Sequence, residues 1–376
     1  MMKSKSSIAP LLAAFYFFYF AMVGVYVIFM PKVLKDIGYS PVEIGIIYTS
    51  APLMRFLLPF VFKRFISLNN RVFLVALLLI TISTLLFFIS IDNFWLLLTI
   101  NLIFGGAMGV VLPFIEIIAL EFIGKERYGK VRLWGSIGFS VVAFILGKIL
   151  DGFEIALFFL IATALLTSLF GYLLSSFNTQ ITEPKAQTNK EFSLSKYWAL
   201  WASIFLFQFS FGGFYNFFTI YETSNGMPLD IVSYLWIFGV VCEIVMLQFQ
   251  GPLLAKYPLL TLINISIISA IFRWALLAIY PTNLAILLLT QATHALSFAL
   301  YYTSTIAYIY QLYPQKKLAQ QFLLGVGFGL GGALGAAVAG VIYKYSPSGL
   351  FLFESFIALL ASIMLIIHKK RKESEA

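Results

Sequence analysis

Several ionisable side chains lie inside apolar stretches of this sequence that are long enough to cross a bilayer, and five are the clearest cases. They are Arg55, Glu116, Glu243, Arg273 and His294. A charge at bilayer depth costs about 2.5–3.5 kcal/mol on insertion scales, so such residues tend to be functional. A carboxyl group in a low-dielectric site can bind and release a proton near neutral pH, and a histidine can relay it. We therefore predict that Glu243, His294 and Arg273 couple a proton to solute movement. Structural ion pairing is the alternative.

The depth of each charge follows from the rise of a helix, which is about 1.5 Å per residue. Arg55, Glu243 and His294 lie roughly 18, 20 and 15 Å from the outer ends of their stretches, and so share a central layer. Arg273 lies nearer the outer end, at roughly 10 Å. These depths leave open whether Glu243 and Arg273 form a pair.

A second predicted site lies near the inner end of the stretches. Glu116 falls there, and Arg132 begins the next apolar stretch. Because an arginine can neutralise a carboxylate at the membrane edge, we predict that Glu116 and Arg132 pair as a cytoplasmic gate.

Polar and aromatic residues recur every three or four positions along three stretches, which places each set on one helical face. The sets are Gln208, Gly212, Tyr215, Thr219 and Glu222; Gln291, His294, Phe298, Tyr301, Thr305 and Tyr308; and Tyr16, Tyr19, Val23 and Tyr26. A polar face avoids lipid, so these faces predict a central cavity able to stack a ring-shaped solute. The predicted substrate-binding residues are Arg55, Tyr16, Gln208, Tyr215, Gln291 and Tyr301. Packing and interfacial anchoring are the alternative for any one tyrosine.

The composition of the chain indicates that these apolar stretches lie in a lipid bilayer. The chain of 376 residues is 61% hydrophobic and 11% charged, whereas a soluble domain is about 45–50% apolar and about 25% charged. A spanning helix needs about 20 apolar residues, and twelve segments qualify, so we predict an all-α membrane protein. The segments are 8–30, 43–61, 72–90, 94–121, 132–150, 155–176, 198–221, 230–251, 258–280, 284–311, 320–343 and 350–368. The first is expected to be a retained helix rather than a signal peptide.

The charges between the spans predict the orientation. Most of the 25 Lys and Arg fall in loops and tails that share one side if the N-terminus is cytoplasmic. This bias follows the positive-inside rule and predicts that both termini are cytoplasmic. Because the basic residues flank apolar runs instead of forming a solvated patch, we exclude nucleic acid as a partner despite the net charge of +9.

The longest polar stretch divides the chain into two halves. It lies within residues 178–197, and we predict a cytoplasmic linker there between six-helix bundles at 1–177 and 198–376. Pro41 with Glu43 opens one predicted span and Pro228 with Asp230 opens another, as expected for a repeat, although helix-start chemistry also explains it. Duplication of a six-helix unit is typical of the major facilitator architecture.

Four segments carry a resemblance to a known family. They are Tyr128–Phe139 (YGKVRLWGSIGF), Leu235–Ile244 (LWIFGVVCEI), Arg273-Trp274, and Gln291–Phe298 (QATHALSF). Together they resemble the phenyl propionate permease group of the major facilitator superfamily. The resemblance implies proton-driven uptake of a solute such as an aromatic carboxylate across a bacterial cytoplasmic (inner) membrane.

Two features depart from the family pattern. Segment 63–67 (KRFIS) lacks the Gly and Asp of the usual superfamily motif, and Tyr301 and Tyr302 stand where a second histidine is expected. An acid, an arginine and a histidine on successive spans are also similar to the layout of proton–sugar symporters.

We therefore predict a secondary transporter that works by alternating access, as a monomer, with a small-molecule substrate and protons as partners and with no cofactor or metal. A sugar or nucleoside symporter or a multidrug exporter of the same fold stays open as the alternative. An integral-membrane enzyme would need a catalytic constellation, and the two histidines and one cysteine form no metal or nucleophile motif. A receptor or scaffold would be favoured by large soluble domains, which the sequence lacks.

Overall fold

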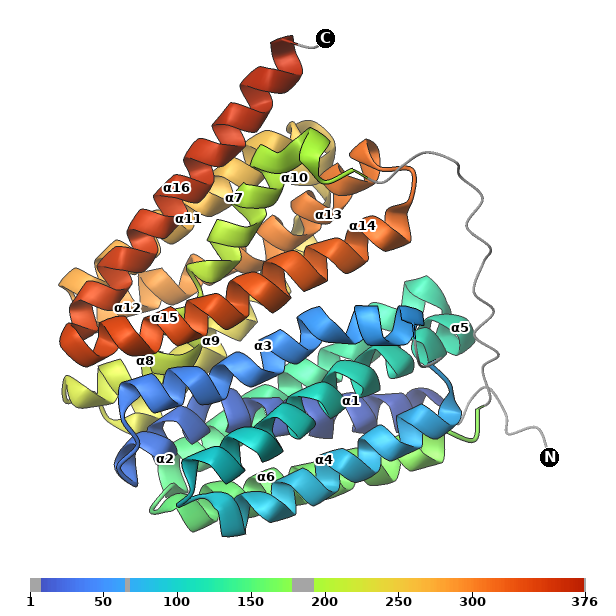
Figure 1. Cartoon of the computed structure of the whole chain (residues 1–376), viewed down its shortest axis with the longest axis vertical. Helices are drawn as coiled ribbons and strands as arrows, with labels where there is room; N and C mark the ends of the chain where they lie inside the picture. Colours follow the sequence, from blue (N-terminus) through green and yellow to red (C-terminus); the bar gives the residue numbers. More distant parts are fainter. Residues whose placement is uncertain (1–7, 65–67, 178–192, 375–376) are drawn as a thin grey trace. The chain divides into compact units, whose positions relative to one another are not determined.

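The computed structural model of the chain describes residues 8–64, 68–177 and 193–374, and every regular element in these ranges is helical (Figure 1). Eleven helices in the described chain are long and apolar enough to cross a membrane without interruption. The prediction of an all-α membrane protein is confirmed.

The elements before residue 178 give six of these spans. They are α1 (Ile8–Gly24), the π-helix η2 (Val25–Phe29), α2 (Met30–Asp36), α3 (Pro41–Arg64), α4 (Asn70–Ser90), α5 (Phe94–Ile149) and α6 (Phe153–Leu174). The helix α5 contains two spans, because Gly124 takes φ 73° and ψ 167° and turns the chain between them. This left-handed φ is one that glycine adopts without a Cβ penalty. The predicted span 8–30 is longer than expected, since α2 continues to Asp36.

The elements after the predicted linker follow the same pattern with more interruptions. They are the 3₁₀ turn η3 (Ser195–Tyr197), α7 (Trp198–Phe209), α8 (Gly212–Ser224), α9 (Leu229–Phe249), α10 (Gly251–Lys256), α11 (Leu259–Ile279), α12 (Leu284–Ala292), the π-helix η4 (Ala295–Leu300), α13 (Tyr301–Leu312), α14 (Lys316–Phe322), the π-helix η5 (Leu323–Gly331), α15 (Gly332–Tyr345) and α16 (Pro347–Ser374).

The predicted span 198–221 is present but interrupted, so it is not among the eleven continuous helices. It forms α7 and α8, and the chain leaves the helix at Ser210 and Phe211. The break lies where Gly212 meets the backbone of Gly335 on α15, so closely that a Cβ at residue 212 would overlap it. Glycine permits this approach, and the approach fixes the position of the break.

Several helices begin with side-chain caps, as their sequences lead one to expect. The side chains of Asn69, Asn93 and Asn283 accept hydrogen bonds from backbone N–H groups three residues later, at 3.0–3.2 Å. Ser40 and Glu43 form a reciprocal capping box at the start of α3. These caps satisfy N–H groups that a helix leaves unpaired.

The chain divides into two compact units, each with its own packed helices. The first comprises Met1–Glu183 with Pro228–Ile237, and the second comprises Pro184–Met227 with Phe238–Ala376. In the first unit α5 packs against α1, α3 and α4, and α6 packs against α1 and α4 (Figure 1). In the second unit α16 packs against α7 and α11, α8 against α15, and α11 against α12, η4 and α13. The packing of α11 on α12 and η4 brings Arg273 and His294, two of the predicted proton-coupling residues, together.

Candidate functional site

Arg273, on α11, is the centre of a polar cluster inside the second unit. It is 1% exposed and reaches three residues on the neighbouring α12–η4 segment. Its Nη1 lies 2.9 Å from Nδ1 of His294, its Nη2 donates to Oε1 of Gln291 at 3.3 Å, and its Nη1 also lies 3.4 Å from Oγ of Ser297. Three polar partners help offset the cost of desolvating a buried guanidinium.

Two aromatic rings lie against the same guanidinium. Its central carbon is 4.1 Å from the ring centre of Phe214 on α8 and 4.6 Å from that of Trp274. A cation within about 6 Å of an aromatic ring face is attracted by the ring quadrupole, most strongly where water is excluded. Phe214 and Trp274 therefore stabilise the charge of Arg273 inside the unit.

The contact with Arg273 fixes the form of His294. Because an arginine can only donate, Nδ1 of His294 must accept and carries no hydrogen. The proton of the neutral ring therefore sits on Nε2. This atom lies 3.8 Å from Oε2 of Glu243 on α9, an ion-pair distance too long for a hydrogen bond. His294 thus bridges the Arg273 and Glu243 side chains.

The three predicted proton-coupling residues differ in their access to the surroundings. The side chains of Glu243 and His294 are 23% and 10% exposed, whereas Arg273 is 1% exposed. At a separation of 3.8 Å, a short movement of the Glu243 carboxylate would bring it within hydrogen-bond distance of Nε2–H of His294.

Glu354, on α16, is a further acidic residue of this cluster that the sequence did not single out. It is 2% exposed, and its Oε1 accepts a hydrogen bond from the backbone N–H of Gly213 at the start of α8. Its charge also acts on Arg273. Glu354 is the one acid within the predicted span 350–368, and this position in an apolar stretch is the signal that could have identified it.

The predicted substrate-binding residues of the second unit lie in different surroundings. Gln291 holds Arg273, as described above. Tyr301 is 1% exposed and packs on Phe207 with ring centres 4.1 Å apart. Tyr215 stacks on Phe211 at 5.8 Å, and Gln208 packs beside Gly327 and Gly331 of η5. Gln291 is in direct contact with the charged cluster, and Tyr215 packs on Phe214 and lies within electrostatic range of Arg273.

A second polar cluster lies in the first unit and contains the predicted gate residues. The hydroxyl of Tyr128 donates to Oε1 of Glu116 at 3.2 Å. The guanidinium of Arg132 lies over the rings of Phe20 and Tyr16, at 3.9 and 5.4 Å from their centres. Glu116 and Arg132 therefore lie in one cluster, but no ion pair joins them within the described chain; the aromatic rings hold the cation instead.

The remaining predicted substrate residues also belong to the first unit. Tyr16 is fully buried in the Glu116 cluster, with its ring 6.5 Å from that of Tyr128. Arg55, on α3, has an exposed side chain and acts electrostatically on Tyr19. Arg55 is thus an exposed cation on α3, whereas Tyr16 is buried among aromatic rings.

Comparison with known proteins agrees with this architecture. Residues 10–353 match the MFS_1 like family. The probable 3-phenylpropionic acid transporter of Escherichia coli (strain K12) is 27% identical over 375 residues, which cover 94% of this chain and 96% of that protein. The maltose permease of Geobacillus stearothermophilus is 21% identical over 298 residues, covering 75% of this chain and 74% of the permease.

A solved structure shares the fold at low sequence identity. The crystal structure of the nucleoside transporter NupG matches with a TM-score of 0.78 and 19% identity, covering 97% of this chain and 99% of NupG. The family match spans both units and includes every residue of the charged cluster except Glu354. The chain therefore belongs to the MFS_1 like family of the major facilitator superfamily, and is an integral-membrane secondary transporter for a small molecule rather than an enzyme.

Proposed function

We propose that this transporter is a proton-coupled symporter that imports a small organic solute, such as an aromatic carboxylate, by alternating access. The observation that supports the proposal most directly is the series Arg273, His294 and Glu243, in which one imidazole bridges a buried cation and a partly exposed acid. Similarity over nearly the full length to a probable 3-phenylpropionic acid transporter supports the substrate class.

Glu243 is the proton carrier in this proposal. Its carboxylate is the most exposed member of the series, and protonation makes it neutral before the site changes the side to which it is exposed. His294, held in the Nε2–H form by Arg273, then no longer faces a negative charge at 3.8 Å. The loss of this attraction changes the balance of forces on Arg273, and the change favours one conformation over the other.

The substrate anion is proposed to bind Arg55, with Gln208, Tyr215, Gln291, Tyr301 and Tyr16 as further binding residues. Arg55 is favoured for the anionic group because its guanidinium is exposed, and a carboxylate can accept two hydrogen bonds from it. Glu116 and Arg132 are proposed to act in the cytoplasmic gate through Tyr128 and the rings around Arg132.

A sugar or nucleoside symporter is the second candidate. Similarity to the maltose permease and the fold shared with NupG favour it, as do the glutamines and tyrosines among the proposed binding residues, because neutral hydroxyl-rich solutes are recognised by hydrogen bonds and ring stacking. Arg55 would then have no anionic group to bind.

The proposal includes a topology and an assembly. The transporter lies in the bacterial cytoplasmic membrane as a monomer, with both termini cytoplasmic and six-helix halves at residues 1–177 and 198–376. The positive-inside bias of the Lys and Arg supports the orientation, and cysteine scanning of loop residues from each side tests it.

The proton-coupling proposal is tested in proteoliposomes with an imposed pH gradient. Labelled 3-phenylpropionate, a disaccharide and a nucleoside are offered in parallel, and the aromatic acid is expected to accumulate. Glu243→Gln is expected to abolish accumulation while substrate exchange at equal pH persists. The matched control is Glu154→Gln, which changes an exposed acid at the start of α6 and is expected to behave like the wild type. Unchanged accumulation by Glu243→Gln would refute its role as proton carrier.

A further inference from the structure

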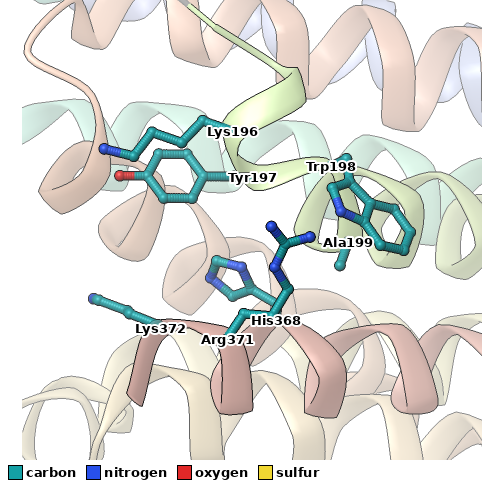
Figure 2. A pocket seen from close by; sticks show the side chains of 7 residues that line it. All are labelled: Lys196, Tyr197, Trp198, Ala199, His368, Arg371 and Lys372. Carbon is teal, nitrogen blue, oxygen red and sulfur yellow. The ribbon is translucent and has the colours of Figure 1, made fainter. Parts of the chain in front are cut away.

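A basic pocket lies at the N-terminal end of α7 and the C-terminal end of α16, apart from the residues proposed to bind substrate or protons. Figure 2 shows the side chains that line it: Lys196, Tyr197, Trp198, Ala199, His368, Arg371 and Lys372. Lys196 and Tyr197 come from η3 and the others from α7 and α16, so segments far apart in the sequence form the pocket within the second unit.

The cations of the pocket lie against aromatic rings. Arg371 lies 5.9 Å from the ring centre of Trp198 and points from α16 toward η3 (Figure 2). Lys196 lies 5.5 Å from the ring of Tyr197, and Lys372 lies 5.2 Å from the ring of Tyr308. In Figure 2 the ammonium groups of Lys196 and Lys372 extend to the same side of the pocket. Three cations thus line one pocket.

The floor of the pocket is fixed by a buried histidine. His368 is 4% exposed, its Nε2 lies 2.8 Å from the hydroxyl of Tyr308, and its ring meets that of Tyr197 edge-on at 5.8 Å. Among the described residues that line the pocket none is acidic. Like charges held together without a carboxylate repel one another, and an anion placed between them removes that repulsion.

We propose that this pocket binds the phosphate-bearing headgroup of an anionic phospholipid. A phosphodiester supplies oxygens that a guanidinium can hold with two parallel hydrogen bonds and that ammonium groups neutralise. A lipid is favoured over a free anion because Trp198 is 45% exposed at the end of an apolar helix, as is typical of aromatic residues at a membrane interface. Basic clusters at the end of a spanning helix bind anionic lipids for the same reason.

The positions of the basic residues on α16 make it possible to distinguish binding in the pocket from general attraction to a basic C-terminal segment. The last turns of α16 carry four consecutive basic residues, Lys369 to Lys372. Arg371 and Lys372 line the pocket, whereas Lys369 and Lys370 do not, and Lys369 pairs instead with Glu373 at 3.8 Å. Removing either adjacent pair changes the net charge by the same amount on the same helix.

The test compares these two pairs in the full-length purified chain. Native mass spectrometry in detergent measures how many phosphatidylglycerol molecules stay bound as the lipid is titrated, with phosphatidylcholine of the same acyl chains as the neutral lipid. We expect Arg371→Ala with Lys372→Ala to weaken phosphatidylglycerol binding about 30-fold, since each basic residue near an anionic headgroup contributes about fivefold. Lys369→Ala with Lys370→Ala is expected to leave it nearly unchanged.

A single substitution outside α16 keeps the test valid if the double variant fails to fold. Lys196→Ala, in η3, is expected to weaken phosphatidylglycerol binding about fivefold. Equal losses from both pairs of substitutions in α16 would show non-specific attraction to a basic tail and overturn the proposal. Equal binding of phosphatidylcholine, or full displacement of phosphatidylglycerol by excess inorganic phosphate, would overturn it as well, because the pocket would then not recognise an anionic lipid.

Discussion

Replacing Arg273 by lysine keeps the positive charge and removes the planar fork of donors, so it tests the geometry of the cluster. The guanidinium reaches His294 through Nη1 and Gln291 through Nη2. A lysine ammonium is a single point on a flexible stem. We expect it to keep the shorter contact, which is that to His294, and to lose the contact to Gln291.

The expected loss of stability follows from the Gln291 side chain, which would lose its contact with Arg273. Gln291 is 1% exposed, and its amide nitrogen has no hydrogen-bond partner in the structure. Loss of Arg273 would therefore leave its Oε1 buried and unpaired too, which costs about 1–3 kcal/mol. Because an ammonium still lies against Phe214 and Trp274, most of the attraction between cation and rings is kept. We expect Arg273→Lys to lower the free energy of unfolding by about 2 kcal/mol.

The assay is unfolding in mixed micelles with increasing SDS, followed by tryptophan fluorescence, together with uptake by the same preparation. Arg71→Lys is the matched control, because Arg71 is exposed near the start of α4; it should change stability by no more than about 0.5 kcal/mol. Arg273→Lys should also lower proton-driven uptake more than exchange. Wild-type stability and uptake in Arg273→Lys would refute the idea that the fork geometry organises the site.

Three further substitutions test other contacts by the same unfolding measurement. Gly212→Ala places a methyl group against the backbone of α15 and is expected to cost about 1–3 kcal/mol, whereas Gly251→Ala, with open space around it, should be nearly neutral; equal effects would contradict the close approach. Glu354→Ala removes the acceptor at the start of α8 and should destabilise by about 1–3 kcal/mol, more than Glu354→Gln, which can still accept; the reverse order would contradict this. Tyr128→Phe should cost about 1 kcal/mol by leaving Glu116 without its donor, and no loss would mean that the bond contributes nothing.

Much of the fold could be predicted from the sequence, because a bilayer demands long apolar helices and charges stand out within them. The same property made Glu243, Arg273 and His294 conspicuous as charges within apolar spans, but their depths left open whether Glu243 and Arg273 form a pair. The depth estimate placed Arg273 closer to the outer end than His294, and the long arginine side chain spans that difference. Sequence alone could not show that His294 lies between the other two, because the contact depends on how α11 packs against α12 and η4.

The features that escaped prediction depend on contacts between distant segments. Glu354 belongs to the site because Gly213, far away in the chain, presents an N–H to it. The break between α7 and α8 depends on the close approach of Gly212 to Gly335. Apolar periodicity continues through this break and through the three π-helices, so it carries no signal for them.

The predicted gate residues Glu116 and Arg132 show that charge and depth in the sequence do not determine which groups make contact. A carboxylate and an arginine at the same predicted depth suggested an ion pair, yet Arg132 lies on the rings of Tyr16 and Phe20, while Glu116 accepts from Tyr128. Aromatic residues are abundant in this chain, at 18%, and a ring face can stabilise a cation where a carboxylate would add a second charge to desolvate. Pairing rules based on charge alone therefore overestimate ion pairs in such a chain.

The charged cluster and the break in the seventh predicted span share two adjacent residues. Gly213 donates its backbone N–H to Glu354, and Phe214 presents its ring to Arg273. The start of α8 is thus held by an acid and a cation that also act on each other. A helix is weakest where its backbone bonds are interrupted, since fewer of them must be broken to move it. A change in charge around Arg273 therefore acts on the backbone where the span resists movement least.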